Sequence, residues 1–262
     1  RSAPTTSASP SRAVTTISQE LLEKTIITEI EDLVALSPGV FTQSFFGVAG
    51  SLDVRGTPGE NYFRGIKRIS NPGNYATPIG ASSRVDIVRG PASPIYGPSQ
   101  IGGYLNFVPK SARAETGKFL TEPTAQIGIN YGSYELKTLH GEVGGPTTIG
   151  GKEAGYYLYG ESTNSGSFYE NTDLSQTIVQ ASFDVSLSDT WRAEFGGMYQ
   201  FYRGNQVAGW NRLTQDLVDN SNYITGSPAS LDRNGDGLLS DTESVAGGLG
   251  GPFYTGGTGL PF

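Results

Sequence analysis

The stretch from Val85 to Lys110 reads VDIVRGPASPIYGPSQIGGYLNFVPK and decides the fold more than any other part of the chain. It predicts a strand (VDIV), an Arg-Gly-Pro turn, a loop rich in Gly, Pro and Ser, and a second strand (YLNFV). Glycine permits tight turns and close backbone approaches, and the prolines stiffen the loop between them. We therefore expect two strands joined by a structured loop.

The same stretch resembles the signature of the plug domain of TonB-dependent outer-membrane receptors. In that family an Arg-Gly-Pro turn, a Tyr-Gly pair and a Gly-Gly pair before an Asn-bearing strand follow one another in this order and spacing. Three later segments resemble the opening barrel strands of the same family: Tyr131–Tyr134, Gly144–Pro146 and Ser188–Trp191. The resemblance implies an α+β plug domain followed by antiparallel transmembrane β-barrel strands, as the N-terminal part of a plugged barrel of about 22 strands.

The composition agrees with a β-protein of the bacterial envelope and argues against other classes. The 262 residues include 37 Gly and no Cys, so disulfides and thiolate metal sites are excluded. A net charge of -7 argues against nucleic acid as a partner, because a phosphate-binding face needs a surplus of Lys and Arg. No apolar run approaches the roughly 18 residues of a membrane helix, so only a β-barrel could place this chain in a membrane.

Changes in composition and hydrophobic pattern divide the chain into four regions. Residues 1–17 are rich in Ser, Thr, Ala and Pro without an apolar period, and we expect a flexible lead-in. Residues 18–115 form the plug domain, in which Ser18 is the expected N-cap of a short helix reaching about Lys24. Thr28 and Glu31 form the expected capping box of a second helix. A strand is expected over 62–69.

Residues 116–203 read as the first barrel strands. Segments of alternating polarity cover 124–131, 135–144, 155–164, 175–187 and 191–202, and their lengths suit tilted membrane strands of roughly 9–11 residues or slightly more. A soluble β-sandwich would alternate too, so the alternation alone leaves both open. Because the smallest membrane barrels have about eight strands, we expect a longer receptor that continues beyond Phe262, and a mature or trimmed start at Arg1. Tyr202 is assigned to an interfacial aromatic girdle.

Residues 204–262 are expected to form an extracellular loop that carries an EF-hand-like calcium site. The run DRNGDGLLSDTE spans Asp232–Glu243 and places oxygen donors where calcium needs them, with Gly237 at the sharp turn. The alternative is a solvated acidic loop that binds no metal. We predict a structural Ca²⁺ that orders the loop, held by Asp232, Asn234, Asp236, the carbonyl of Leu238, Ser240 and Glu243.

By resemblance, the apical loops of the plug bind the cargo. Arg55 and Tyr96 match family positions near the substrate chamber, and Asn71 and Tyr75 lie on the loop between them. An Arg suits an anionic, oxygen-rich chelate, and a Tyr ring offers a flat amphipathic contact. For Arg55 an internal ion pair with Asp53 or Glu60 is the alternative.

Two arginines of the plug region need separate interpretations. Arg89 is expected to pair with carboxylates of the barrel wall, because a desolvated guanidinium needs a partner. Arg64 precedes a glycine where plugs of the family usually show an acidic residue, so the contacts of this turn do not follow from the resemblance.

The resemblance implies a receptor of the bacterial outer membrane, in contact with its lipid. It would bind an external nutrient, which we expect to be a ferric siderophore, and pass it to the periplasm when a TonB-type energy-transducing protein pulls on the plug. We expect no enzyme, because the single histidine, His140, lies in a predicted strand without a nucleophile–base arrangement. Two rivals are a secreted, calcium-stabilised β adhesion module and a non-transporting surface sensor of the same family.

Overall fold

The computed structural model describes residues 5–9, 12–25, 27, 29–45, 49–69, 75–92, 101–113, 117–169, 172–205 and 215–220. The chain divides into two compact units, Arg1–Val207 and Ala208–Phe262. In the second unit the described element is helix α2 (Gln215–Asn220). No helix in the described part is long and apolar enough to cross a membrane. We call residues 5–113 the plug region and the five strands that follow the wall sheet.

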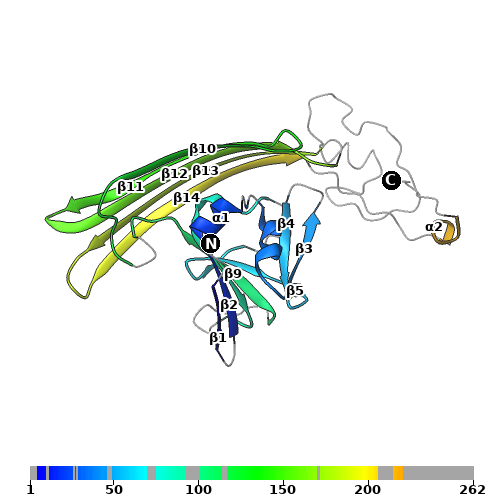
Figure 1. Ribbon diagram of the computed structural model, residues 1–262, viewed down its shortest axis with the longest axis horizontal. Coiled ribbons are helices and arrows are strands. Elements are labelled where there is room, and N and C mark those ends of the chain that lie inside the picture. The colour runs from blue at the N-terminus through cyan, green and yellow to red at the C-terminus, as the bar shows by residue number, and fades with distance from the viewer. Residues whose placement is uncertain are drawn as a thin grey trace, which may run out of the picture. The chain divides into compact units, whose positions relative to one another are not determined.

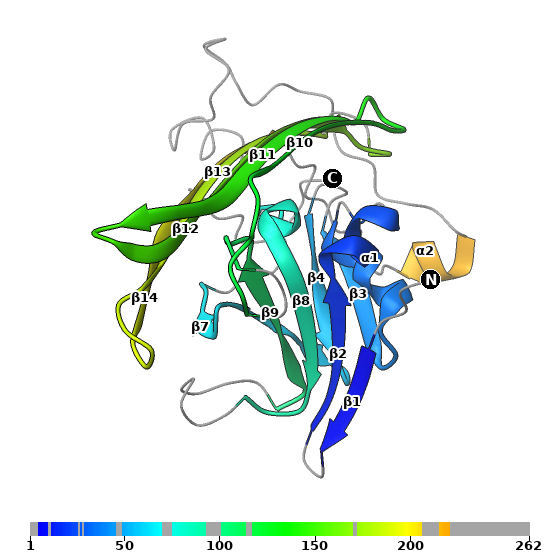
Figure 2. The ribbon, with the colours of Figure 1, turned by 60° about the vertical axis from the view of Figure 1, so that its left-hand side comes forward.

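A six-stranded sheet forms the centre of the plug region. It contains β1 (Thr5–Ser9), β2 (Arg12–Ser18), β6 (Glu60–Phe63), β7 (Ile66–Lys67), β8 (Ser82–Arg89) and β9 (Gly103–Pro109), in the order β1-β2-β8-β9-β6-β7. Strands β1, β2, β8 and β9 lie side by side in Figure 2. Neighbours are antiparallel except β6 and β9, which are parallel. The two strands predicted within Val85–Lys110 are confirmed as the paired strands β8 and β9.

Short helices cover one face of this sheet. Helix α1 (Gln19–Lys24) begins after Ser18, whose hydroxyl accepts a hydrogen bond from the Leu21 amide at 3.4 Å, which confirms the predicted N-cap. The next helix, η1 (Ile30–Leu36), is a 3₁₀ helix. Its capping box joins Glu29 and Asp32, so the predicted box at Thr28 and Glu31 is wrong by one residue. A third short helix is η2 (Ile79–Ala81).

A smaller sheet of β3 (Val40–Phe45), β4 (Ala49–Val54) and β5 (Thr57–Pro58) completes the plug region. The strand predicted over 62–69 is instead a hairpin of β6 and β7. Arg64 and Gly65 form its turn with φ of 49° and 75°. One apolar core joins the helices to both sheets: Ile17, Leu21, Leu22, Ile30, Leu33, Leu52, Val54, Ile79, Val85, Ile87, Leu105 and Phe107.

The prediction of a flexible lead-in over residues 1–17 is wrong for the part that the structure describes, residues 5–9 and 12–17. Strand β2 pairs with β8 from Ala13 to Ser18, and Thr15 and Ile17 are fully buried between the sheet and the helices. β-Branched threonines suit a pleated strand, and pairing with β8 supplies the hydrogen bonds that the segment lacks by itself. A composition rich in Thr and Ser therefore did not reveal that this segment is an interior strand.

Replacing Ile17 with Ala tests this correction. The side chain is fully buried, so we expect the substitution to lower the free energy of unfolding of the plug by about 2–4 kcal/mol. Urea unfolding of the plug in the purified whole receptor measures the difference. An unchanged urea midpoint would contradict the buried strand and favour a flexible lead-in.

The wall sheet consists of five long antiparallel strands in sequence order. They are β10 (Thr124–Tyr131), β11 (Lys137–Ile149), β12 (Lys152–Gly166), β13 (Asp173–Ser186) and β14 (Arg192–Asn205), and each pairs with the next. Figure 1 shows them as one curved sheet. All five predicted strands are confirmed as elements, although several ends differ.

The β11–β12 connection shows why those ends differ. The strand predicted over 135–144 is too short, because β11 continues to Ile149 and the turn consists of Gly150 and Gly151, with φ of 58° and 75°. Gly144 lies within the strand for another reason: a Cβ there would stand 2.3 Å from the Tyr157 ring. The glycine makes room for an aromatic ring on the neighbouring strand, not for a turn.

Candidate functional site: the interface between plug region and wall sheet

The two faces of the wall sheet have opposite polarity, and the polar face is the buried one. On β13, Gln180 and Asp184 are 3% and 0% exposed, whereas Val179, the residue before Gln180, is 54% exposed. The same holds across the sheet, whose exposed apolar side chains include Ile127, Ile129, Leu139, Leu158, Phe195, Tyr199 and Phe201. A soluble sandwich buries its apolar face, so this reversed pattern fits strands with lipid outside and a polar lumen.

The girdle interpretation of Tyr202 is wrong for the same reason. Tyr202 follows the buried parity of β14, next to Gln200, and its hydroxyl is buried. The outward positions beside it are taken by Phe201 and Tyr199.

Lys110 forms the most enclosed polar contact between plug region and wall sheet. Its ammonium pairs with the Glu142 carboxylate of β11, and both side chains are 6% exposed. The Gln19 amide of α1 donates to the other Glu142 oxygen at 3.5 Å, and the ammonium lies 4.7 Å from the centroid of the Tyr159 ring. Gln180 donates to the Lys110 carbonyl at 3.2 Å. One lysine thus joins a plug helix to three wall strands.

A second cation meets the wall three residues later. Nε of Arg113 lies 3.4 Å from Oδ1 of Asp184 on β13, and the Asp184 side chain is 0% exposed. Among the residues that the structure describes, neither oxygen of this carboxylate has a hydrogen-bond partner. Asp184 is therefore held by charge attraction, with Arg113 as the ion-pair partner.

Arg64 supplies the third cation, from the turn where this sequence departs from the family pattern. Its guanidinium pairs with Glu194 of β14 and donates to the Ser182 hydroxyl at 3.4 Å. Burial lowers the pKa of Arg64, and the carboxylate of Asp184 opposes that change. The arginine in place of an acidic residue thus meets an acidic partner on the wall.

Arg89 contacts none of the five described wall strands, so the predicted wall partner is not found among them. Its guanidinium donates to the Ser37 hydroxyl at 3.2 Å and to the Pro38 carbonyl at 2.8 Å, all within the plug region. Because the end of η1 presents these oxygens to the buried Arg89, a barrel carboxylate is not needed.

The predicted cargo-binding residues are not gathered by the described part of the structure. Arg55 is exposed in the β4–β5 turn with φ of 52°, and its amide donates to the Gly39 carbonyl at 3.0 Å. Tyr75 is half-buried shortly before η2. Asn71 and Tyr96 lie outside the described residues. So does the calcium loop from Asp232 to Glu243, and its Ca²⁺ site stays a prediction.

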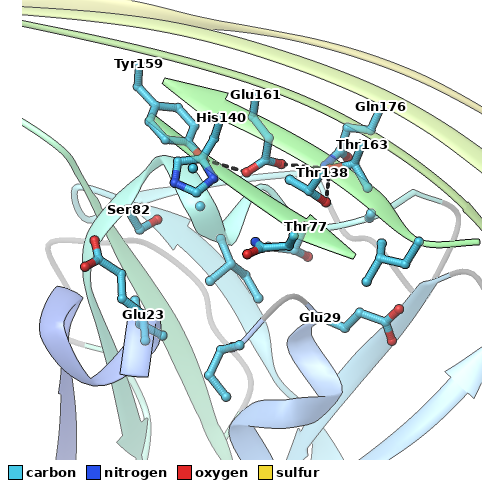
Figure 3. Close-up of a pocket in the computed structure, with 18 of the residues that line it drawn as sticks. Glu23, Glu29, Thr77, Ser82, Thr138, His140, Tyr159, Glu161, Thr163 and Gln176 are labelled. Atoms are coloured by element: carbon cyan, nitrogen blue, oxygen red, sulfur yellow. Dashed lines mark hydrogen bonds between the residues drawn. The ribbon is translucent and has the colours of Figure 1, made fainter. Parts of the chain in front are cut away.

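A cavity of about 330 Å³ lies along the same interface. Its wall side, drawn in Figure 3, carries a hydrogen-bonded row: the Tyr159 hydroxyl donates to Glu161, Thr163 donates to Glu161 at 3.4 Å, and Thr163 lies 3.0 Å from Thr138. The His140 ring stacks against Tyr159 with centroids 6.5 Å apart. These groups can hold water and small polar solutes.

Two carboxylates open helix η1 near this cavity, and burial raises the pKa of both. The pKa of Glu29, which lines the cavity, is raised by desolvation and by Asp32. Desolvation also raises the pKa of Glu31, to about 7. The folded plug therefore holds a proton on Glu31 at pH values where the unfolded chain has released it.

This shift gives a pH-dependent prediction. Below pH 4.5 Glu31 is protonated in both states and has no effect; between pH 4.5 and about 7 only the unfolded state ionises, so stability falls as pH rises. Above about pH 7 Glu31 is ionised in both states, and its burial lowers the free energy of unfolding by about 2 kcal/mol after allowance for solvent screening. The E31Q variant should therefore gain stability relative to the parent across this window, as measured by urea unfolding at several pH values. Parallel pH profiles for the two proteins would contradict the shift.

The residues that join plug region and wall were missed at the level of sequence, although a signal existed. Glu142, Asp184 and Glu194 all fall on the polar face of predicted membrane strands, where a charge requires a partner. Lys110 and Arg113 directly follow the last plug strand. A search for cations at that junction would have proposed them.

A family model matches the plug region. Residues 6–104 match the TonB-dependent Receptor Plug Domain, and the match includes β2 and the segment from Val85 to Tyr104. The match begins within the stretch that was expected to be a flexible lead-in.

Several solved receptor structures share the fold of this chain. The ferripyoverdine receptor of Pseudomonas aeruginosa, solved with ferripyoverdine, matches with a TM-score of 0.63 and 17% identity, over 76% of this chain and 27% of that one. The ferric-catecholate import receptor Fiu of E. coli K12 matches with 0.62 and 19%, over 84% and 31%. The ferric preacinetobactin receptor BauA of Acinetobacter baumannii matches with 0.60 and 18%, over 73% and 28%. The chain thus spans less than a third of each of these structures.

Proposed function

We propose that the chain belongs to the TonB-dependent receptors of the bacterial outer membrane and that the whole receptor takes up a ferric siderophore. The observation that carries the proposal is the set of ion pairs at the interface between the plug region and the wall sheet. Three cations of the plug region pair with three carboxylates on the inner face of a wall whose outer face is apolar. This arrangement suits a plug held inside a barrel, which must be displaced before cargo can pass.

The nature of the cargo is supported by the neighbours. The three receptors described above bind or import ferripyoverdine, ferric catecholate and ferric preacinetobactin, as their names state. All three are iron chelates. A ferric siderophore is therefore the cargo class that we propose for this chain, and an enzymatic role is not needed for its capture.

Arg55 is our first choice for a cargo contact in the described plug region. Its left-handed φ of 52° is costly for a residue with a side chain, by about 1–3 kcal/mol, and such strain concentrates at functional positions. The exposed guanidinium offers paired donors to an anionic chelate. We group Tyr75, Asn71 and Tyr96 with it as further cargo contacts.

The proposed energy source is a TonB-type protein that pulls on the N-terminal side of the plug. The alternative within the family is a surface sensor that binds the same cargo without moving it. The inside-out polarity of the wall sheet opposes the secreted adhesion module, because its exposed apolar face would meet water.

Binding of ferric siderophores to the purified whole receptor tests the proposal. We expect saturable binding of at least one chelate in a panel of catecholate, hydroxamate and mixed types. The quenching of tryptophan fluorescence serves as the measure of binding. Arg55→Ala should weaken it at least tenfold, whereas the matched Arg192→Ala, on β14, should leave it unchanged. Absence of binding across the panel would contradict the proposal.

A further inference from the structure

Among the cavities against the inner face of the wall sheet, two lie toward opposite ends of the strands. The turn-end cavity is the one of about 330 Å³ in Figure 3. It is lined by Asn130, Thr138 and Thr163, near the β10–β11 turn. The linker-end cavity, of about 790 Å³, is lined by Thr124, Arg192 and other residues at the end where the chain enters the wall sheet.

The two cavities adjoin at one place. Four residues line both of them: Gln19, Glu23, Lys110 and Gln126. Glu142, which lines the linker-end cavity and is the strand partner of Gln126, forms the buried ion pair with Lys110 there. The partition between the cavities is therefore built from the Lys110–Glu142 pair and the Gln19 amide that donates to it.

The turn-end cavity has the features of a hydrated space. The hydroxyls of Thr77 and Ser82 line it, and both side chains are more than nine-tenths buried. Neither hydroxyl oxygen has a hydrogen-bond partner among the described residues. Buried hydroxyls of this kind are normally satisfied by water, and the row from Tyr159 to Thr138 offers further polar partners.

Gln19 connects the partition to the N-terminal strands. It is the first residue of α1 and follows β2 directly, and β1 and β2 form one edge of the plug sheet. A pull on the chain before Arg12 would peel β1 and β2 from β8 and carry Gln19 away from Glu142. The Lys110–Glu142 pair would then lose its hydrogen-bonded support from α1.

We propose that the Lys110–Glu142 pair is a gate between the two cavities, which together form a hydrated passage for small ions along the wall side of the plug. The inference rests on the proposed function, because the pull is that of the energy-transducing partner. The closed pair blocks the passage at rest, and displacement of α1 opens it. An ion pair suits this role, because it can close a polar path without placing apolar side chains in it.

Conductance of the purified whole receptor in planar bilayers, with potassium chloride as the probe, tests the gate without cargo or partner. We expect K110M and E142Q each to raise the conductance several-fold above the parent. The charge exchange K110E/E142K should return it toward the parent value. The matched control K67M removes the lysine of another plug ion pair, with Glu60, that lines neither cavity, and should behave as the parent.

Protease protection of the plug in the same samples separates a gate from a lost plug. Parent-level conductance in both single variants, with the plug protected, would overturn the gate. A conductance rise that accompanies plug release and is not reversed by the exchange would overturn it as well. Failure of the proposed function is a different result, because the parent would then bind no ferric siderophore whatever its conductance.

Discussion

Arg113→Met should destabilise the docked plug by about 3–5 kcal/mol. Asp184 is fully buried, and its carboxylate oxygens have no hydrogen-bond partner among the described residues. Removal of its ion-pair partner, 3.4 Å away, leaves an uncompensated charge inside the interface. Urea titration of the purified whole receptor, with plug release followed by limited proteolysis, measures the effect.

Two further variants make this result specific to the buried pair. The double variant R113M/D184N removes both charges and should recover most of the lost stability, because an uncharged pair leaves no unpaired ion. Arg192→Met breaks a pair whose arginine side chain is 48% exposed, and should cost about 1 kcal/mol or less. Equal effects of R113M and R192M would show that burial of Asp184 does not govern the interface.

Gly103→Ala should cost about 3 kcal/mol or more, and it tests the Gly-Gly pair at the start of β9. A Cβ at this position would stand 2.2 Å from the Val88 carbonyl oxygen and 2.5 Å from a Val54 methyl carbon. The carbonyl belongs to the backbone of β8, so relief requires the β8–β9 pairing to shift. Unfolding of the plug in the whole receptor, followed by circular dichroism and proteolysis, provides the measurement.

Gly160→Ala is the matched control for this prediction. Gly160 lies on the outward parity of β12, and a Cβ there would meet nothing within 4 Å. The control should stay within about 0.5 kcal/mol of the parent. If G103A lowers the free energy of unfolding no more than G160A does, close packing does not require the glycine. The interpretation of the Gly-Gly pair as a close backbone approach would then be wrong.

The sequence was sufficient for those elements whose signals are local. The glycines and prolines between Val85 and Lys110 marked β8 and β9, Ser18 marked the start of α1, and period-two alternation marked all five wall strands. The choice between a soluble and a membrane sheet was not local. It depended on which face is buried, and the exposure of Val179 beside buried Gln180 decided it.

The missed features depend on contacts between distant segments. Strand β2 looked like a linker because its stability comes from pairing with β8, about seventy residues away. Arg89 was given a wall partner, yet the end of η1 supplied oxygens nearer to it. Lys110 and Arg113 took that role, and only docking of the plug region against β11 and β13 brings them to Glu142 and Asp184.

Accumulation of radiolabelled iron by cells that produce the whole receptor tests the central claim most directly. Supplied with the ferric siderophore that the purified receptor binds, these cells should accumulate iron, and cells lacking the receptor should not. Collapse of the proton-motive force should abolish the uptake while binding at the surface persists. Binding without energy-dependent accumulation would contradict a transporter and identify a sensor of the same family.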